Sequence, residues 1–134
     1  MTSPSRFSRS VSGVRRIWLI IGWGLILLVI YLSLTPAPIQ VPMEEGDKLG
    51  HVLAYATLMA WFANCYEMAG QRKMLAISLV AMGIALEFLQ GWTGYRSFEV
   101  ADMMAGAAGV AGGWIAAPPR TPNCLSWIEK RLRQ

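Results

Sequence analysis

The chain has 134 residues, of which 54% are hydrophobic and 15% charged, and its mean hydropathy is +0.40. This length allows one domain at most and excludes a multidomain enzyme, and the apolar content excludes a disordered protein. Two cysteines are too few for a disulfide-stapled scaffold or a cysteine-rich zinc module.

The N-terminal part of the chain divides into a polar segment and a long apolar segment. Residues 1–14 are rich in serine and arginine, and we expect them to be disordered. The apolar run 17–34 approaches the about 20 residues that a membrane-spanning helix needs. It exceeds the about 7–15 apolar residues of a signal peptide, and Pro36 and Pro38 are unfavourable beside a cleavage site. We therefore predict a retained helix over about 17–35.

Three further apolar stretches reach a spanning length only if each admits a polar residue near one end. They predict helices over about 48–66, 73–90 and 100–117. With the first span, they form a four-helix membrane domain over 15–119, followed by a basic cytoplasmic tail over 120–134. The expected fold class is all-α, a polytopic four-helix transmembrane bundle.

Lysine and arginine are distributed unevenly between the two sides of these helices. The N-terminal segment, the second loop and the tail hold all of them except Lys48 and Arg96, which flank the first and third loops. The positive-inside rule then places both termini in the cytoplasm, in a bacterial inner membrane. The net charge of +4 reflects this topology, and no nucleic-acid partner is expected because no basic face with stacking residues is present.

The C-terminal tail contains a short amphipathic pattern. Leu125, Ile128 and Leu132 fall on one helical face, with Trp127 and several cations beside them. This pattern suits a short helix on the anionic inner leaflet. A frayed, solvated tail is the alternative.

Ionisable residues fall at one depth in three predicted spans. At 1.5 Å per residue, His51, Glu87 and Asp102 each lie roughly 21–22 Å from the cytoplasmic ends of their helices. The hydrocarbon core is about 30 Å thick. These residues are therefore expected to converge in the outer third of the bilayer.

Helical spacing adds detail to this cluster. Asp47, His51 and Tyr55 share one helical face, and Asp47 is placed to accept the ring N–H of His51 and fix its tautomer. Ionisable residues within spans normally face the bundle interior and pair there. We therefore expect Arg96, the nearest guanidinium, to pair with Glu87 or Asp102.

The fourth predicted span carries a ridge of small residues at every fourth position, namely Ala101, Ala105, Gly109 and Gly113. Such ridges let helix backbones approach closely. The ridge is expected to draw Asp102 toward the neighbouring helices, and it could also serve a homo-oligomer.

Three strings follow one another along the chain: DKLGH with Tyr55 after it, EFLQ, and RSFEVAD before a glycine-rich helix. In content and order they resemble the VanZ-like family of small membrane proteins. The resemblance covers roughly residues 34–113. It implies a compact helical membrane domain and a link to teicoplanin resistance. One departure is Gly106, where the family often has asparagine. The family's polar positions fall on Asp47, Lys48, His51, Tyr55, Glu87, Gln90, Arg96 and Asp102.

Three interpretations of these residues remain open. They could form a structural network that locks the helices in register. They could bind an envelope lipid or a lipid-linked cell-wall precursor, with Lys48, His51 and Arg96 contacting phosphate or sugar. They could also form a membrane-embedded enzyme, in which His51 oriented by Asp47 is the general base and Glu87 or Asp102 the general acid.

Neither a metal nor a cofactor is expected. Asp47, His51, Glu87 and Asp102 are residue types that could hold a divalent ion. The sequence contains no HxxxH or HExxH pair, however, and a cluster with a single histidine is more often an ion-pair network. Membrane lipids or a lipid-linked precursor are the expected partners.

Overall fold

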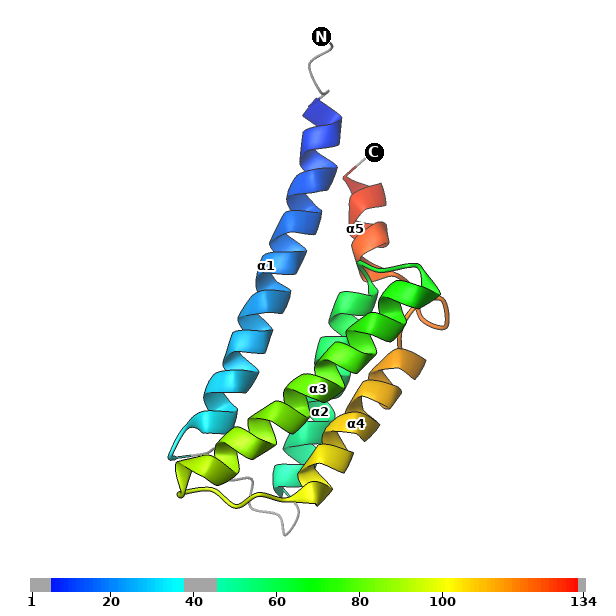
Figure 1. The fold of residues 1–134 in the computed structure, drawn as a ribbon. Coiled ribbons are helices and arrows are strands. Elements are labelled where there is room, and N and C mark those ends of the chain that lie inside the picture. The colour runs from blue at the N-terminus through cyan, green and yellow to red at the C-terminus, as the bar shows by residue number, and fades with distance from the viewer. Residues whose placement is uncertain (1–5, 38–45, 133–134) are drawn as a thin grey trace.

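The computed structural model describes residues 6–37 and 46–132. Over these ranges the chain is all-α, with five helices and no strand, as the sequence predicts. The helices of Figure 1 are α1 (Arg6–Leu34), α2 (Gly46–Ala63), α3 (Ala69–Thr93), α4 (Val100–Ile115) and α5 (Cys124–Arg131).

The first four helices lie within a few residues of the four predicted spans, apart from the start of α1. By length and composition, two stretches can cross a membrane: Gly13–Leu34 of α1, and α3. Helix α4 is apolar but has only 16 residues, and α2 has 18 residues and opens on Asp47 and Lys48. The structure therefore gives two membrane-length helices and two shorter ones.

Helix α1 begins earlier than the sequence suggests. It starts at Arg6, inside the segment 1–14 that we expect to be disordered. No proline interrupts residues 6–16, and extending an existing helix is far easier than nucleating a new one. The apolar helix therefore continues into the basic segment, while residues 1–5 lie outside the described part of the chain.

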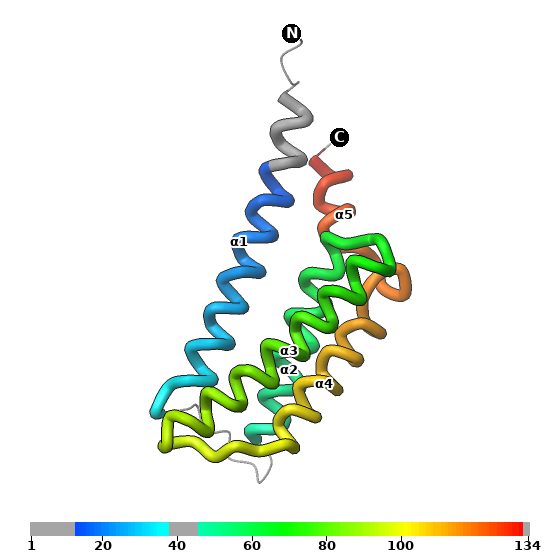
Figure 2. The backbone as a smooth tube through the Cα atoms, in the orientation of Figure 1, coloured from blue at the N-terminus to red at the C-terminus, as the bar shows by residue number. Residues whose placement is uncertain are grey.

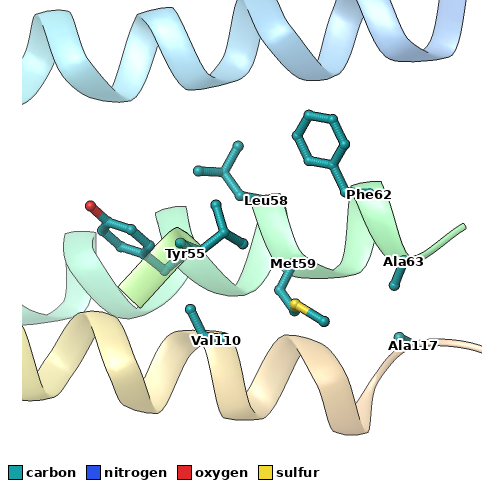
Figure 3. Packing of buried hydrophobic residues seen from close by; sticks show 8 residues of the cluster. Tyr55, Leu58, Met59, Phe62, Ala63, Val110 and Ala117 are labelled. Atoms are coloured by element: carbon teal, nitrogen blue, oxygen red, sulfur yellow. The ribbon is translucent and has the colours of Figure 1, made fainter. Parts of the chain in front are cut away.

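Helices α2 and α4 form the most closely packed pair in the bundle. A Cβ atom added at Gly109 would overlap the carbonyl oxygen of Val52, and one at Gly113 would overlap that of Ala56. Figure 3 shows Met59 of α2 pointing toward α4. The predicted ridge of small residues thus packs against α2 of the same chain, and any homo-oligomer remains a prediction that must use another face.

Helix α1 packs on the opposite side of α2 and is joined to it by two tryptophans. Each indole Nε1 donates to the other residue's main-chain oxygen, Trp18 to Trp61 at 3.0 Å and Trp61 to Trp18 at 2.9 Å. The rings stack with centroids 4.0 Å apart. Leu58 and Phe62 of α2 point toward α1 (Figure 3). Most of the apolar surface of α1 remains exposed, including Leu27 at 66%.

A buried arginine holds one end of the bundle together. Arg72, in the first turn of α3, is only 7% exposed. Its Nε donates to the oxygen of Tyr66 at 2.6 Å and its Nη2 to that of Ala63 at 3.1 Å, while Nη1 donates to that of Pro118. The guanidinium thus satisfies carbonyls near the ends of α2 and α4, although its position in the sequence marks it only as a loop charge.

Helix α5 confirms the predicted helix in the tail and docks on the bundle. Leu125 is 2% exposed. The Asn123 side chain accepts from the main-chain N–H of Ser126, and the Asn64 side chain accepts from that of Cys124, both at 2.9 Å. Helix α5 lies beside α1 (Figure 1), so residues 124–131 are packed and not a frayed tail.

Candidate functional site

The start of α2, the end of α3 and the start of α4 meet at the end of the bundle opposite α5 (Figure 2). There His51, Glu87 and Asp102 each direct one nitrogen or oxygen atom to a common point, and these atoms lie within 4.8 Å of one another. The structure thus brings together the three residues that the sequence places at one depth. Helix α2 supplies His51, α3 supplies Glu87 and α4 supplies Asp102.

His51 has a defined ring orientation. Its Nδ1 lies 3.0 Å from the main-chain oxygen of Asp47. A carbonyl oxygen can only accept, so Nδ1 carries the hydrogen, and in the neutral ring Nε2 is left with a free lone pair. The ring also stacks on Tyr55, with centroids 6.5 Å apart and planes at 5°.

The sequence predicts that the Asp47 carboxylate accepts the ring N–H of His51, but in the structure a different atom of Asp47 does so. Its side chain is exposed, and the residue orients His51 through its main-chain carbonyl. The reason is the helical spacing, because an i−4 carbonyl lies directly beside the His51 ring nitrogen. Any residue type at position 47 would offer the same acceptor.

Glu87 and Asp102 are buried carboxylic residues with few partners. Glu87 is 2% exposed and Asp102 is 7% exposed. Glu87 Oε1 accepts from the main-chain N–H of Glu99 at 2.6 Å. Asp102 Oδ1 is buried without a hydrogen-bond partner in the structure. A buried polar atom without a partner carries a desolvation cost of about 1–3 kcal/mol, so this oxygen requires an explanation.

A cavity of about 210 Å³ adjoins this cluster. Val29 and Leu32 of α1 and Ala54 of α2 form apolar walls, whereas most of the polar lining comes from α2, α3 and the loop before α4. His51 belongs to both the cavity lining and the cluster. The polar side chains among the lining residues are Ser33, Asp47, His51, Tyr55, Gln90 and Arg96.

Of the remaining predicted site residues, Gln90 and Arg96 line the cavity and Lys48 does not. Gln90 is 2% exposed, and its Nε2 donates to the main-chain oxygen of Ser33 at 2.8 Å, which ties α3 to α1. Arg96 lines the cavity, and among the described residues no ion pair joins it to Glu87 or Asp102. Lys48 is half-buried and does not line the cavity.

Tyr55 is seated between two glycines. A Cβ at Gly83 would lie 3.1 Å from its hydroxyl oxygen, and one at Gly106 would lie 3.3 Å from its ring. Tyr55 is 2% exposed as a result. Gly106 therefore makes room for the tyrosine that stacks on His51.

Sequence reasoning misses the main-chain groups of this site. The N–H of Glu99 and the carbonyls of Ser33 and Asp47 hold Glu87, Gln90 and His51, and no residue type signals them. The hydroxyl of Ser97 is exposed and donates to the Glu99 carboxylate at 3.1 Å.

The cluster offers one imidazole nitrogen and two carboxylates in a buried setting, beside a small cavity lined by one guanidinium. These groups can bind a cation, share a proton or bind a polar headgroup. Comparison with protein-family models, with curated proteins and with solved structures finds no match to this chain.

Proposed function

We propose that the chain is a VanZ-like protein of the bacterial inner membrane, in which α1–α4 cross the bilayer and both termini are cytoplasmic. The exposed apolar surface supports this proposal. Ile20, Leu27 and Tyr31 of α1 are 63–66% exposed, and Ile77 and Phe88 of α3 are 56% and 61% exposed. Exposed apolar surface of this extent requires a membrane or a partner.

The distribution of charge supports the orientation. The N-terminal end of α1, the first turns of α3, and α5 lie at one end of the bundle (Figure 1), and these segments carry eight of the twelve lysines and arginines. The cluster of His51, Glu87 and Asp102 lies at the opposite end. By the positive-inside rule, the cluster and its cavity then face the outer side.

The function proposed for the cavity is to bind the phosphate-bearing headgroup of an envelope lipid or a lipid-linked cell-wall precursor. One observation carries this proposal: Arg96, which has no ion-pair partner among the described residues, lines a cavity together with the half-buried imidazole of His51. Guanidinium groups suit phosphate because they donate two parallel hydrogen bonds to its oxygens.

The size and walls of the cavity limit which ligands can fit. Its volume of about 210 Å³ is below the about 300–1,000 Å³ of pockets for drug-sized ligands. It suits a phosphate or pyrophosphate group better than an extended glycan. Val29 and Leu32 of α1 line the same cavity, so a lipid tail beside α1 would find apolar contacts.

Native mass spectrometry of the purified full-length protein tests this function. We expect the wild type to retain a phosphate-bearing lipid, and Arg96→Gln to retain at least about tenfold less, because a hydrogen bond to a charged group is worth about 1.5–3 kcal/mol. The matched control is Arg120→Gln, which removes an exposed arginine at the other end of the bundle.

The retained mass distinguishes a phospholipid from a lipid-linked precursor. Equal lipid retention by wild type and Arg96→Gln, both with the thermal stability of the control, would contradict the proposal. A fall in the thermal stability of Arg96→Gln would instead favour a structural network.

A further inference from the structure

We infer that His51, Glu87 and Asp102 bind one divalent transition-metal cation of the Zn²⁺ or Mn²⁺ type. This differs from the sequence-based expectation of no metal, because the three ligands come from three helices and only the fold brings them together. The inference does not depend on the function proposed for the cavity.

The ligand set fits such an ion. One imidazole nitrogen and two carboxylate oxygens suit a borderline divalent cation, since imidazole favours zinc and carboxylates favour manganese. Metal–ligand distances of about 2.0–2.2 Å put tetrahedral ligands about 3.3–3.6 Å apart. The three atoms lie within 4.8 Å of one another, so side-chain rotations that move each atom by about 1 Å would bring them to these distances.

The outer contacts of the ligands are those of a metal site. The Nδ1–H of His51 is committed to the main-chain oxygen of Asp47 at 3.0 Å, which leaves Nε2 as the coordinating nitrogen. Metal-bound histidines almost always donate their other N–H to a carbonyl or carboxylate in this way. Glu87 is likewise oriented, because its Oε1 accepts from the N–H of Glu99 at 2.6 Å.

The two buried carboxyl groups have no lysine or arginine partner among the described residues. Asp102 Oδ1 is buried and has no hydrogen-bond partner, and Asp102 as a whole is 7% exposed. Glu87, beside it, is 2% exposed, and Arg96 pairs with neither carboxylate. Buried charges are expected to be paired or to coordinate metal, and a divalent cation would balance both carboxylates at once.

Three protein ligands leave one coordination position open, as in sites that bind water or substrate. Because His51 also lines the cavity of about 210 Å³, the open position would be next to that space. If the cavity binds phosphate, the cation would explain how two carboxylates can border an anion site.

Metal content and affinity of the full-length protein in detergent test the inference, with Zn²⁺ and Mn²⁺ as probes and no added lipid. We expect the wild type to bind one ion per chain by plasma mass spectrometry and to gain thermal stability that EDTA reverses. Asp102→Asn, which keeps the side-chain shape, should bind at least about 100-fold more weakly, because even outer-shell partners cost about 10–100-fold.

The matched control is Glu99→Gln, which neutralises a nearby exposed carboxylate but keeps the main-chain N–H to Glu87. It should bind the ion as the wild type does. A second variant, His51→Gln, should also lose the ion. The inference is overturned if the wild type binds neither ion stoichiometrically, or if Asp102→Asn and His51→Gln bind it as tightly as the wild type.

Lipid retention is measured separately, in native mass spectra with and without EDTA. Lipid without metal would overturn the metal site and leave the headgroup proposal intact. Metal without lipid would overturn the headgroup proposal and leave the metal site intact.

Discussion

Replacing Gly109 with alanine tests the close approach of α2 and α4. The added Cβ would overlap the carbonyl oxygen of Val52 and come within 3.0 Å of its Cα and 3.1 Å of its carbonyl carbon. These are main-chain atoms that cannot rotate away, so the helices must separate by roughly 1 Å to restore contacts of about 3.5–4.0 Å. Overpacking costs about 1–3 kcal/mol, and alanine regains about 1 kcal/mol of helix propensity. Because the overlap is with main-chain atoms, the upper end of the overpacking cost applies, and we expect a net loss of about 2 kcal/mol.

The assay is thermal unfolding in detergent, followed by tryptophan fluorescence at one fixed scan rate, because the Tm of an irreversible transition depends on the scan rate. A loss of 2 kcal/mol lowers the Tm by about 6–8 °C in a chain of this size. Gly112→Ala is the matched control, because nothing lies within 4 Å of a Cβ at that position, and it should keep or slightly raise the Tm. Equal effects of the two substitutions would refute the packing of α2 on α4 through Gly109.

Three further outcomes follow from the described contacts. Arg72→Ala removes three hydrogen bonds to main-chain oxygens and should lower the free energy of unfolding by about 3–5 kcal/mol. The control Lys73→Ala, at an exposed neighbour, should leave the Tm nearly unchanged. Equal Tm values for the two variants would contradict the buried role of the guanidinium. Maleimide should label the exposed Cys124 within minutes and the buried Cys65 only after denaturation, as intact-mass spectra of each single-cysteine variant would record; rapid labelling of both would contradict the burial. Trp18→Phe keeps an aromatic ring on α1 against Trp61 of α2 but loses the Nε1 hydrogen bond. The Tm should therefore fall by the equivalent of about 1 kcal/mol, and an unchanged Tm would contradict a stabilising role for that bond.

The features that follow helical periodicity could be predicted from the sequence. Counting 1.5 Å per residue places His51, Glu87 and Asp102 at one depth, and the structure brings their side chains within 4.8 Å. The small residues at every fourth position face one side of α4, and the pair Gly109 and Gly113 packs against α2. Both predictions use only the pitch of a helix, and they therefore do not require knowledge of how the chain folds back on itself.

The features that depend on main-chain contacts between distant segments could not be predicted. Arg72 looks like a loop charge, yet it is buried against carbonyls 6, 9 and 46 residues away. Gln90 looks like a ligand residue, yet its amide donates to the oxygen of Ser33, 57 residues earlier. Every residue except proline has the same main-chain donor and acceptor, so the sequence does not mark which carbonyl will face which side chain.

The two ends of the bundle show why the carboxylates are unlike a structural lock. At the α5 end, Arg72 is buried and donates from all three of its guanidinium nitrogens. At the other end, Asp102 keeps a buried oxygen without a partner, and Arg96 lines a cavity without joining either carboxylate. A buried ion network adds little net stability even when complete, and an incomplete one adds less. The unpaired oxygen beside His51 therefore favours a site that a cation completes over one that serves only to hold the helices together.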